Sequence, residues 1–223
     1  MKKQTLILFV FTCFSTAAVF AQQPQFSIST DIGIQRSFKK QQRFGAVGQS
    51  VYGNFHFAPK GGAYFLFAYY TPGNFTNPLT AIARSTATVP QQINFINTAQ
   101  MRFKQLSVGW KKYIKGAYNS EESWNLYGLA GFGLVLGSVE NAHSVSVDTA
   151  LYNVPVIKGK ANFKRLTADL GLGWEAHLGG GIYFYNEAKA WIPTTDYPSK
   201  YIFVNENAPL VGSLSIGIRI LFD

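Results

Sequence analysis

Residues 166–178 read Leu-Thr-Ala-Asp-Leu-Gly-Leu-Gly-Trp-Glu-Ala-His-Leu. Every second residue of this stretch is apolar, and the residues between are glycine or polar. Because successive side chains of an extended strand point to opposite faces, the stretch predicts a strand with one apolar and one polar face. It is long enough to cross a bilayer obliquely. Residues 210–222 repeat the pattern, with Leu214, Ile216 and Ile218 alternating with serine and glycine.

Six more segments show strand-like composition, which brings the expected number of strands to eight. They are residues 26–38, 50–59, 62–71, 100–114, 123–139 and 181–193. In the third strand, Tyr64 to Tyr70 is apolar on both faces, so the pattern does not assign its inner face. The connections alternate between short turns (60–62, 115–122, 179–181) and long polar loops (39–49, 72–99, 140–161, 194–209). This asymmetry is typical of outer-membrane barrels, which have short periplasmic turns and long extracellular loops.

The composition agrees with a membrane barrel. Charged residues make up 14% of the chain, against about 25% in an average soluble domain. After residue 21, no run reaches the ~18 apolar residues of a membrane helix. A closed barrel pairs every backbone group and leaves no strand edge in lipid. We therefore predict an all-β, eight-stranded, antiparallel up-and-down transmembrane barrel. A soluble lipid-carrying barrel of the lipocalin type is the alternative, and it would need a charged exterior.

The N-terminus has the pattern of a cleaved signal peptide. Lys2 and Lys3 precede an apolar run from Leu6 to Phe20, and Ala21 supplies a small residue at the cleavage position. We expect residues 1–21 to be removed and residues 22–223 to form one domain in the outer membrane. The only cysteine, Cys13, leaves with the leader, so the mature chain has no disulfide and no thiol nucleophile.

The mature chain is basic. Without Lys2 and Lys3 it has 18 basic and 11 acidic side chains, a net charge of +7. On an exported protein this charge matches anionic lipid or lipopolysaccharide phosphates, and nucleic acid is not an expected partner.

The whole mature chain resembles the small outer-membrane β-barrel proteins of the Bacteroidetes, including the PorT-like family, with the architecture of the OmpA and OmpX barrels. The resemblance is carried by the alternating strands, the glycine-rich inner faces and the ending Ser-Leu-Ser-Ile-Gly-Ile-Arg-Ile-Leu-Phe-Asp. It implies an outer-membrane location and a terminal aromatic, Phe222, that the barrel-assembly machinery reads. Asp223 follows Phe222, whereas the strictest form of this signal ends on the aromatic.

Ionisable side chains fall on the expected inner faces of the strands. An eight-stranded barrel is filled by its own side chains, so charges inside it must pair. We predict a closed lumen in which Asp169, Glu175 and Glu187 pair with basic partners, and glycines at 131, 133, 171, 173 and 217 leave room for them. A proton or ion path through the same groups is the alternative. The inward set is Asp31, His56, Lys111, Asp169, Glu175, His177, Glu187, Lys189 and Arg219.

Two basic clusters fall at the outer loops. Ammonium and guanidinium groups there could form charge-assisted hydrogen bonds with lipopolysaccharide phosphates, or could simply be a solvated charged face. The candidates for lipid-phosphate contact are Lys39, Lys40, Arg43, Lys158, Lys160, Lys164 and Arg165. The long loops are also candidates for binding a protein partner.

Catalytic candidates are weak. His143, Ser144, Ser146 and Asp148 bring a base, hydroxyls and an acid into one loop, which keeps open a lipid A-modifying deacylase or acyltransferase. The serines stand at the wrong offsets from His143 for a His-x-Ser motif. The three histidines are dispersed, so no metal site or cofactor is predicted. The favoured function is a non-enzymatic barrel with a structural or loop-mediated interaction role, or a component of a secretion or envelope complex.

Overall fold

The structure is a computed structural model that describes residues 24–121, 124–194 and 209–222. The expected signal peptide, residues 1–21, and most of the connection 194–209 lie outside the described residues. The described chain is all-β apart from one 3₁₀ turn, η2 (Lys40–Gln42). None of its helices is long and apolar enough to cross a membrane.

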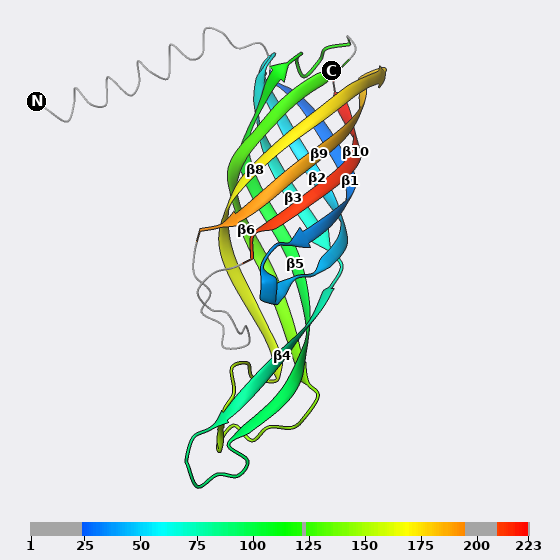
Figure 1. Ribbon diagram of the computed structural model, residues 1–223. Helices are drawn as coiled ribbons and strands as arrows, with labels where there is room; N and C mark the ends of the chain where they lie inside the picture. The colour runs from blue at the N-terminus through cyan, green and yellow to red at the C-terminus, as the bar shows by residue number, and fades with distance from the viewer. Residues whose placement is uncertain (1–23, 122–123, 195–208, 223) are drawn as a thin grey trace, which may run out of the picture.

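Eight antiparallel strands close into a ring, as the alternation predicted (Figure 1). Closure comes from two pairings between strands distant in sequence: β1 with β10, and β3 with β5. Phe26 lies opposite Phe222, so the first and last strands meet along their whole length. The ring consists of β1 (Gln25–Ser37), β2 (Gly45–Ala58), β3 (Gly61–Tyr70), β5 (Gln92–Lys115), β6 (Asn125–His143), β8 (Gly159–Gly179), β9 (Ile182–Pro193) and β10 (Val211–Phe222).

The two ends of the barrel differ. At the turn end, where β1 begins and β10 ends, short connections join β2 to β3, β5 to β6 and β8 to β9. In the last of these, Gly179, Gly180 and Gly181 all have positive φ (123°, 56° and 77°), a backbone region that favours glycine. The opposite end, the loop end, holds η2 and the longer connections.

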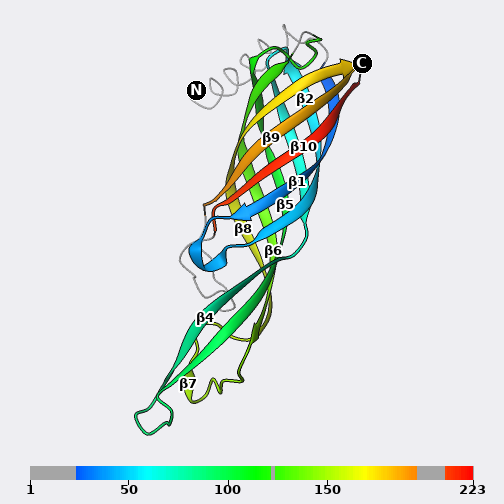
Figure 2. The same ribbon diagram turned by 45° about the vertical axis from the view of Figure 1, so that its right-hand side comes forward.

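Beyond the loop end, the strands continue into a projecting β-sheet, which we call the extension (Figure 2). The expectation that residues 72–99 and 140–161 form polar loops is wrong, because both ranges contain strands. Residues Gly73–Ala83 form β4, which pairs with the first half of β5. β6 continues beside β5, β8 continues beside β6, and the short β7 (Tyr152–Asn153) pairs with β4.

The extension could not be recognised from the alternation because the exposed positions at the start of β4 are polar. In β4, Phe75 and Ala81 are buried, whereas Asn74 and Thr76 are exposed. The strand therefore lacks the apolar outer face that marks the barrel strands. Pro78 is also unusual in a strand, because proline cannot donate a backbone hydrogen bond. It is tolerated here because β4 is an edge strand at that point.

The wall of the ring is apolar on the outside and largely polar within. Leu166, Leu170 and Leu172 of β8 are each more than half exposed, whereas Thr167 and Asp169 between them are buried. An apolar exterior excludes the lipocalin alternative, which needs the opposite arrangement. The structure also settles β3: Tyr64, Leu66, Ala68 and Tyr70 point inward, and Phe65, Phe67 and Tyr69 form part of the outer wall.

Candidate functional site

The lumen at the turn end is organised around Glu175 of β8, which is fully buried. Arg219 of β10 grips its carboxylate with two hydrogen bonds, from Nε to Oε2 at 3.1 Å and from the terminal nitrogen to Oε1 at 2.8 Å. Lys111 of β5 forms a salt bridge to Oε2 at 3.4 Å, and Asn125 donates to Oε1 at 3.2 Å. Bidentate arginine–carboxylate pairs are among the strongest charged contacts in proteins. Together with Lys111 and Asn125, this pair connects β5, β6, β8 and β10.

A second cluster lies on β9, where Glu187 and Lys189 point inward two residues apart. Lys189 Nζ is 2.9 Å from Glu187 Oε1 and 3.7 Å from Asp31 Oδ2 on β1. The hydroxyl of Tyr52 donates to Glu187 and accepts from Lys189. Tyr127 donates to the second oxygen of Glu187 at 3.0 Å, and a further tyrosine, Tyr185, donates to Asp31 at 3.1 Å. Tyrosine hydroxyls from β2, β6 and β9 therefore supply hydrogen bonds to the buried charges of this cluster.

Asp169 is buried with neutral partners. Ser107 donates to one carboxylate oxygen, Thr167 donates to the other at 2.6 Å, and Gln105 donates from 3.1 Å. Among the described residues no lysine or arginine forms a salt bridge with Asp169. The predicted pairing of Asp169 with a basic side chain is therefore wrong: its partners are the neutral donors Ser107, Thr167 and Gln105.

Glycines make space for these inward groups. A Cβ on Gly133 would stand 1.9 Å from the Gln105 amide nitrogen and 2.6 Å from an Asp169 oxygen. A Cβ on Gly173 would stand 2.2 Å from the ring of Tyr127. Side chains at either position would displace the residues that bind Asp169 and Glu187.

The two inward histidines have no part in the ion pairs of the described chain. His177 is only half-buried near the turn end, and its ring lies 5.0 Å from that of Tyr183. His56 is buried, hydrogen-bonds Ser27 at 2.9 Å and stacks on Tyr118 at 4.4 Å between ring centroids. Tyr118 belongs to the β5–β6 connection, and its carbonyl accepts a hydrogen bond from Arg219 at 2.7 Å. This connection therefore folds over the turn end of the lumen.

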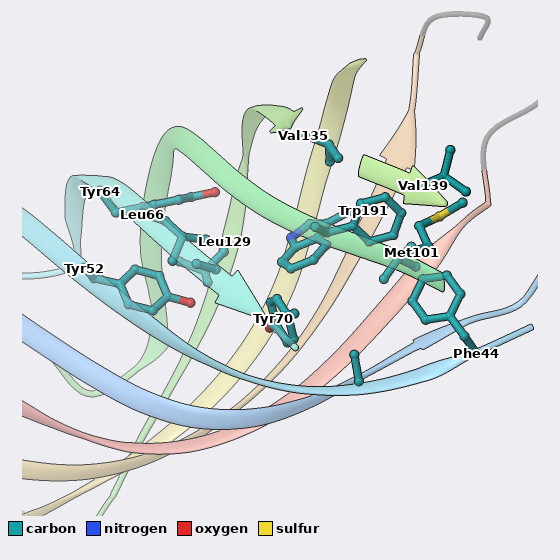
Figure 3. Close-up of a cluster of buried hydrophobic side chains, with 14 of the residues drawn as sticks. Phe44, Tyr52, Tyr64, Leu66, Tyr70, Met101, Leu129, Val135, Val139 and Trp191 are labelled. Carbon is teal, nitrogen blue, oxygen red and sulfur yellow. The ribbon is translucent and has the colours of Figure 1, made fainter. Parts of the chain in front are cut away.

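Toward the loop end, the lumen is filled by apolar and aromatic side chains (Figure 3). Trp191 of β9 packs edge-on against Tyr70 of β3, with ring centroids 5.5 Å apart. The ring centroid of Phe44, a residue between η2 and β2, lies 5.6 Å from that of Phe103 on β5. Met101 is fully buried beside them. No single stretch of sequence marks this layer, because its members come from the middle of β5, the ends of β3 and β9, and the residue before β2.

The lumen is also balanced in charge. Four acidic and four basic side chains are buried in the described chain: Asp31, Asp169, Glu175, Glu187, Lys111, Arg165, Lys189 and Arg219. Charges removed from water are tolerated when opposite charges and hydrogen bonds compensate them. An ionic layer and an aromatic layer therefore follow one another along the lumen.

We expect the purified protein to show no steady conductance steps in a planar bilayer, because eight strands enclose side chains and no continuous water channel. Single-channel recording checks this, with the same bilayer exposed to protein-free detergent as the blank. Reproducible conductance steps from pure protein would instead make the buried charges part of an ion path.

The predicted phosphate-contact residues divide into three groups. Lys40 is exposed in η2, Arg43 is exposed just after it, and Lys39 just before it is partly buried. Lys158, Lys160 and Lys164 are exposed at the start of β8 or just before it. Arg165 differs, because it is 3% exposed and lies inside the barrel. Its position has the same inward parity as Thr167 and Asp169, a signal that the sequence already contained.

The weak catalytic candidates do not form a catalytic unit. His143 ends β6, and its ring packs 4.6 Å from that of Phe95. Burial, and secondarily the charge of Lys158, lowers the pKa of His143. Its Nε2 has no hydrogen-bond partner within the described ranges. Ser144 instead accepts a hydrogen bond from the Ile96 backbone at 2.9 Å, and Ser146 is exposed. A hydroxyl nucleophile needs a base within hydrogen-bond reach.

The described chain contains no group of three or more histidine, aspartate or glutamate side chains placed to hold a metal ion.

Comparison with known proteins shows the fold. No family model and no curated sequence matches the chain. Among solved structures, Neisserial surface protein A (NspA) superposes with a TM-score of 0.57 at 8% identity, over 88% of this chain and 97% of that one. The attachment invasion locus protein Ail of Yersinia pestis, in complex with the heparin analogue sucrose octasulfate, gives 0.50 at 13% identity, over 90% and 100%. The chain therefore has the fold of the small outer-membrane β-barrels.

Proposed function

We propose that this chain is a non-enzymatic outer-membrane protein whose closed barrel anchors the extension outside the cell, where the extension binds a partner. The single observation that carries the proposal is that the chain folds a second β-structure, the extension, beyond the loop end of the barrel. A protein that served only as a membrane plug would not need it. The same architecture suits a component of a secretion or envelope complex.

The extension has a small core of its own, which supports its role as a folded platform. Ala81, Phe95 and Tyr152 are buried together at its far part. The Tyr152 hydroxyl donates to the Pro90 carbonyl at 2.8 Å, and Arg84 Nε donates to the Tyr152 carbonyl at 3.4 Å. These contacts tie β4, β7 and the connection to β5 into one unit. A folded surface binds with a smaller entropic cost than a loop that must be ordered.

The exposed apolar wall supports the membrane location. Soluble monomers rarely expose apolar patches beyond a few hundred Å², whereas this wall is apolar around the ring. Ile32 and Ile34 on β1, Phe132 on β6 and Leu214 and Ile216 on β10 are each more than half exposed. Hydrocarbon is the solvent that suits such a surface.

Export and assembly complete the proposal. Three further parts of the proposal rest on the sequence patterns. Residues 1–21 are removed after export, and the barrel-assembly machinery recognises Phe222. The chain also belongs with the PorT-like barrels of the Bacteroidetes. Phe222 lies at the turn end, 6.0 Å from Phe26 between ring centroids. We also propose that the exposed basic residues near the loop end contact lipopolysaccharide phosphates. They are Lys40, Arg43, Lys158, Lys160 and Lys164.

Surface labelling tests the orientation and the display of the extension. Thr86→Cys places a thiol on the exposed connection between β4 and β5, and Asn119→Cys places one at the turn end. The only natural cysteine is Cys13 of the expected leader. We expect a membrane-impermeant maleimide to label the first variant on intact cells, and the second only after the outer membrane is permeabilised.

Labelling of Asn119→Cys on intact cells, with Thr86→Cys protected, would reverse the proposed orientation. Equal labelling of both variants in a soluble fraction would contradict the membrane location.

A further inference from the structure

A groove on the outer wall of the barrel is lined by three basic side chains, Arg102, Lys104 and Lys164. Its lining comes from three adjacent strands, β5, β6 and β8, and its volume is about 600 Å³. The lining residues are Arg102, Lys104, Leu136, Gly137, Ser138, Asn162, Phe163 and Lys164. We call it the basic groove. Arg102 and Lys104 lie within β5, and therefore outside the two basic clusters of the outer loops.

The strand register shows how the cations converge. Lys104, Leu136 and Lys164 form one row across the three strands, and Arg102, Ser138 and Asn162 form the next row. Neighbouring strands lie about 4.8 Å apart, so Lys104 and Lys164 flank Leu136 at about 10 Å between backbones. Their long flexible stems allow both ammonium groups to approach one ligand above Leu136.

The groove is cationic and rich in donors. Arg102, Lys104 and Lys164 are exposed, and within residues 24–121, 124–194 and 209–222 none of them forms a salt bridge. The Ser138 hydroxyl and Asn162 amide add neutral donors. Glu140 lies in the next row away from the apolar wall and does not line the groove. Guanidinium, ammonium, amide and hydroxyl donors together form the usual recognition set for a phosphate group.

The groove also lies at the boundary of the apolar wall. The row directly below it, toward the turn end, consists of Leu106, Leu134 and Leu166, and the following row contains Val108 and Phe132. On the other side of β5, Lys104 Nζ lies 5.8 Å from the centre of the exposed Tyr69 ring. Tyrosine at such a boundary is typical of the headgroup region of a bilayer.

We propose that the basic groove binds the phosphate of a phosphorylated, acylated glycolipid of the outer leaflet, with the acyl chains lying on the leucine row below. The proposal rests on the proposed outer-membrane location and deepens it by naming the lipid site. A soluble anion would need only the cations, whereas the adjacent apolar rows fit a ligand that carries both phosphate and hydrocarbon. Because all the lining residues belong to paired strands, the site is formed before the lipid arrives.

Lipid binding to folded protein in uncharged maltoside micelles tests the site. The probes are diphosphoryl lipid A, the same lipid after dephosphorylation, and inorganic phosphate, each titrated by native mass spectrometry. The test variant combines Arg102→Gln, Lys104→Gln and Lys164→Gln. The matched control combines Lys60→Gln, Lys112→Gln and Lys115→Gln, which removes the same charge from exposed positions near the turn end. Circular dichroism confirms that each variant is folded.

For diphosphoryl lipid A, we expect the groove variant to bind about tenfold or more weakly than the natural chain, and the control to stay within about twofold. We expect the dephosphorylated lipid to show no difference between the variants. Equal weakening of both variants, or unchanged binding by the groove variant, would overturn the proposal. Inorganic phosphate binding as tightly as the lipid would also overturn it, by showing a site for a free anion.

The micelle assay needs only a folded barrel, whereas the surface-labelling experiment tests location in the cell. A negative result for lipid binding at the groove can therefore be distinguished from a negative result for the proposed function.

Discussion

Arg219→Ala is expected to lower the free energy of unfolding by about 3–5 kcal/mol, because it leaves a buried carboxylate without its main partner. Arg219 is 0% exposed, holds both oxygens of Glu175 and donates to the Tyr118 carbonyl. Its guanidinium carbon also lies 3.9 Å from the centre of the Tyr183 ring. Denaturant-induced unfolding in lipid vesicles, followed by circular dichroism, measures the change.

Lys40→Ala is the control, because Lys40 is exposed in η2 and an exposed charge contributes about 0–1 kcal/mol. A second variant, Arg219→Ala combined with Glu175→Gln, should lose less stability than the two single changes added together, since each single change already includes the loss of the Arg219–Glu175 pair. Equal stability of Arg219→Ala and Lys40→Ala would contradict the structural role of the buried charges.

Leu170→Arg is expected to destabilise the inserted barrel by roughly 2–4 kcal/mol, because it places a charge near the middle of the lipid-facing wall. Leu170 is 51% exposed and lies beside Ala130 and Ala190 on the neighbouring strands. Refolding into phospholipid vesicles, measured as the folded fraction against denaturant, gives the difference.

Leu151→Arg is the matched control, since Leu151 is 49% exposed in the extension and the same charge meets water there. Insertion of the Leu170→Arg variant as efficient as that of Leu151→Arg would mean that this face does not meet hydrocarbon.

Strand alternation was enough to predict the barrel and the direction of most inward side chains. A strand has a period of two residues, so parity alone places Asp169, Glu175 and Arg219 on the face opposite Leu170 and Ile220. Parity failed for β3, because Tyr64, Leu66 and Tyr70 are as apolar as the Phe65, Phe67 and Tyr69 that alternate with them. In β3, the inner face is decided by the register of its pairing with β2 and β5.

The extension could not be predicted from the same signal. An apolar outer face is a property of strands that face hydrocarbon, and β4 faces water. Arg165 shows a different failure: its parity pointed inward, but its neighbours Lys160 and Lys164 suggested a basic surface cluster. Charge clustering along the sequence is a weak guide in a strand, because adjacent residues lie on opposite faces.

The sequence by itself determined the eight strands of the ring, the apolar exterior and the inward parity of the ionisable groups, because all three follow from local two-residue periodicity. Only the tertiary structure decided which charges meet. Glu175 of β8 meets Arg219 of β10 and Lys111 of β5, and Asp169 meets hydroxyl and amide donors. Those partnerships depend on register and on closure of the ring, which bring strands distant in sequence to the same level across the lumen.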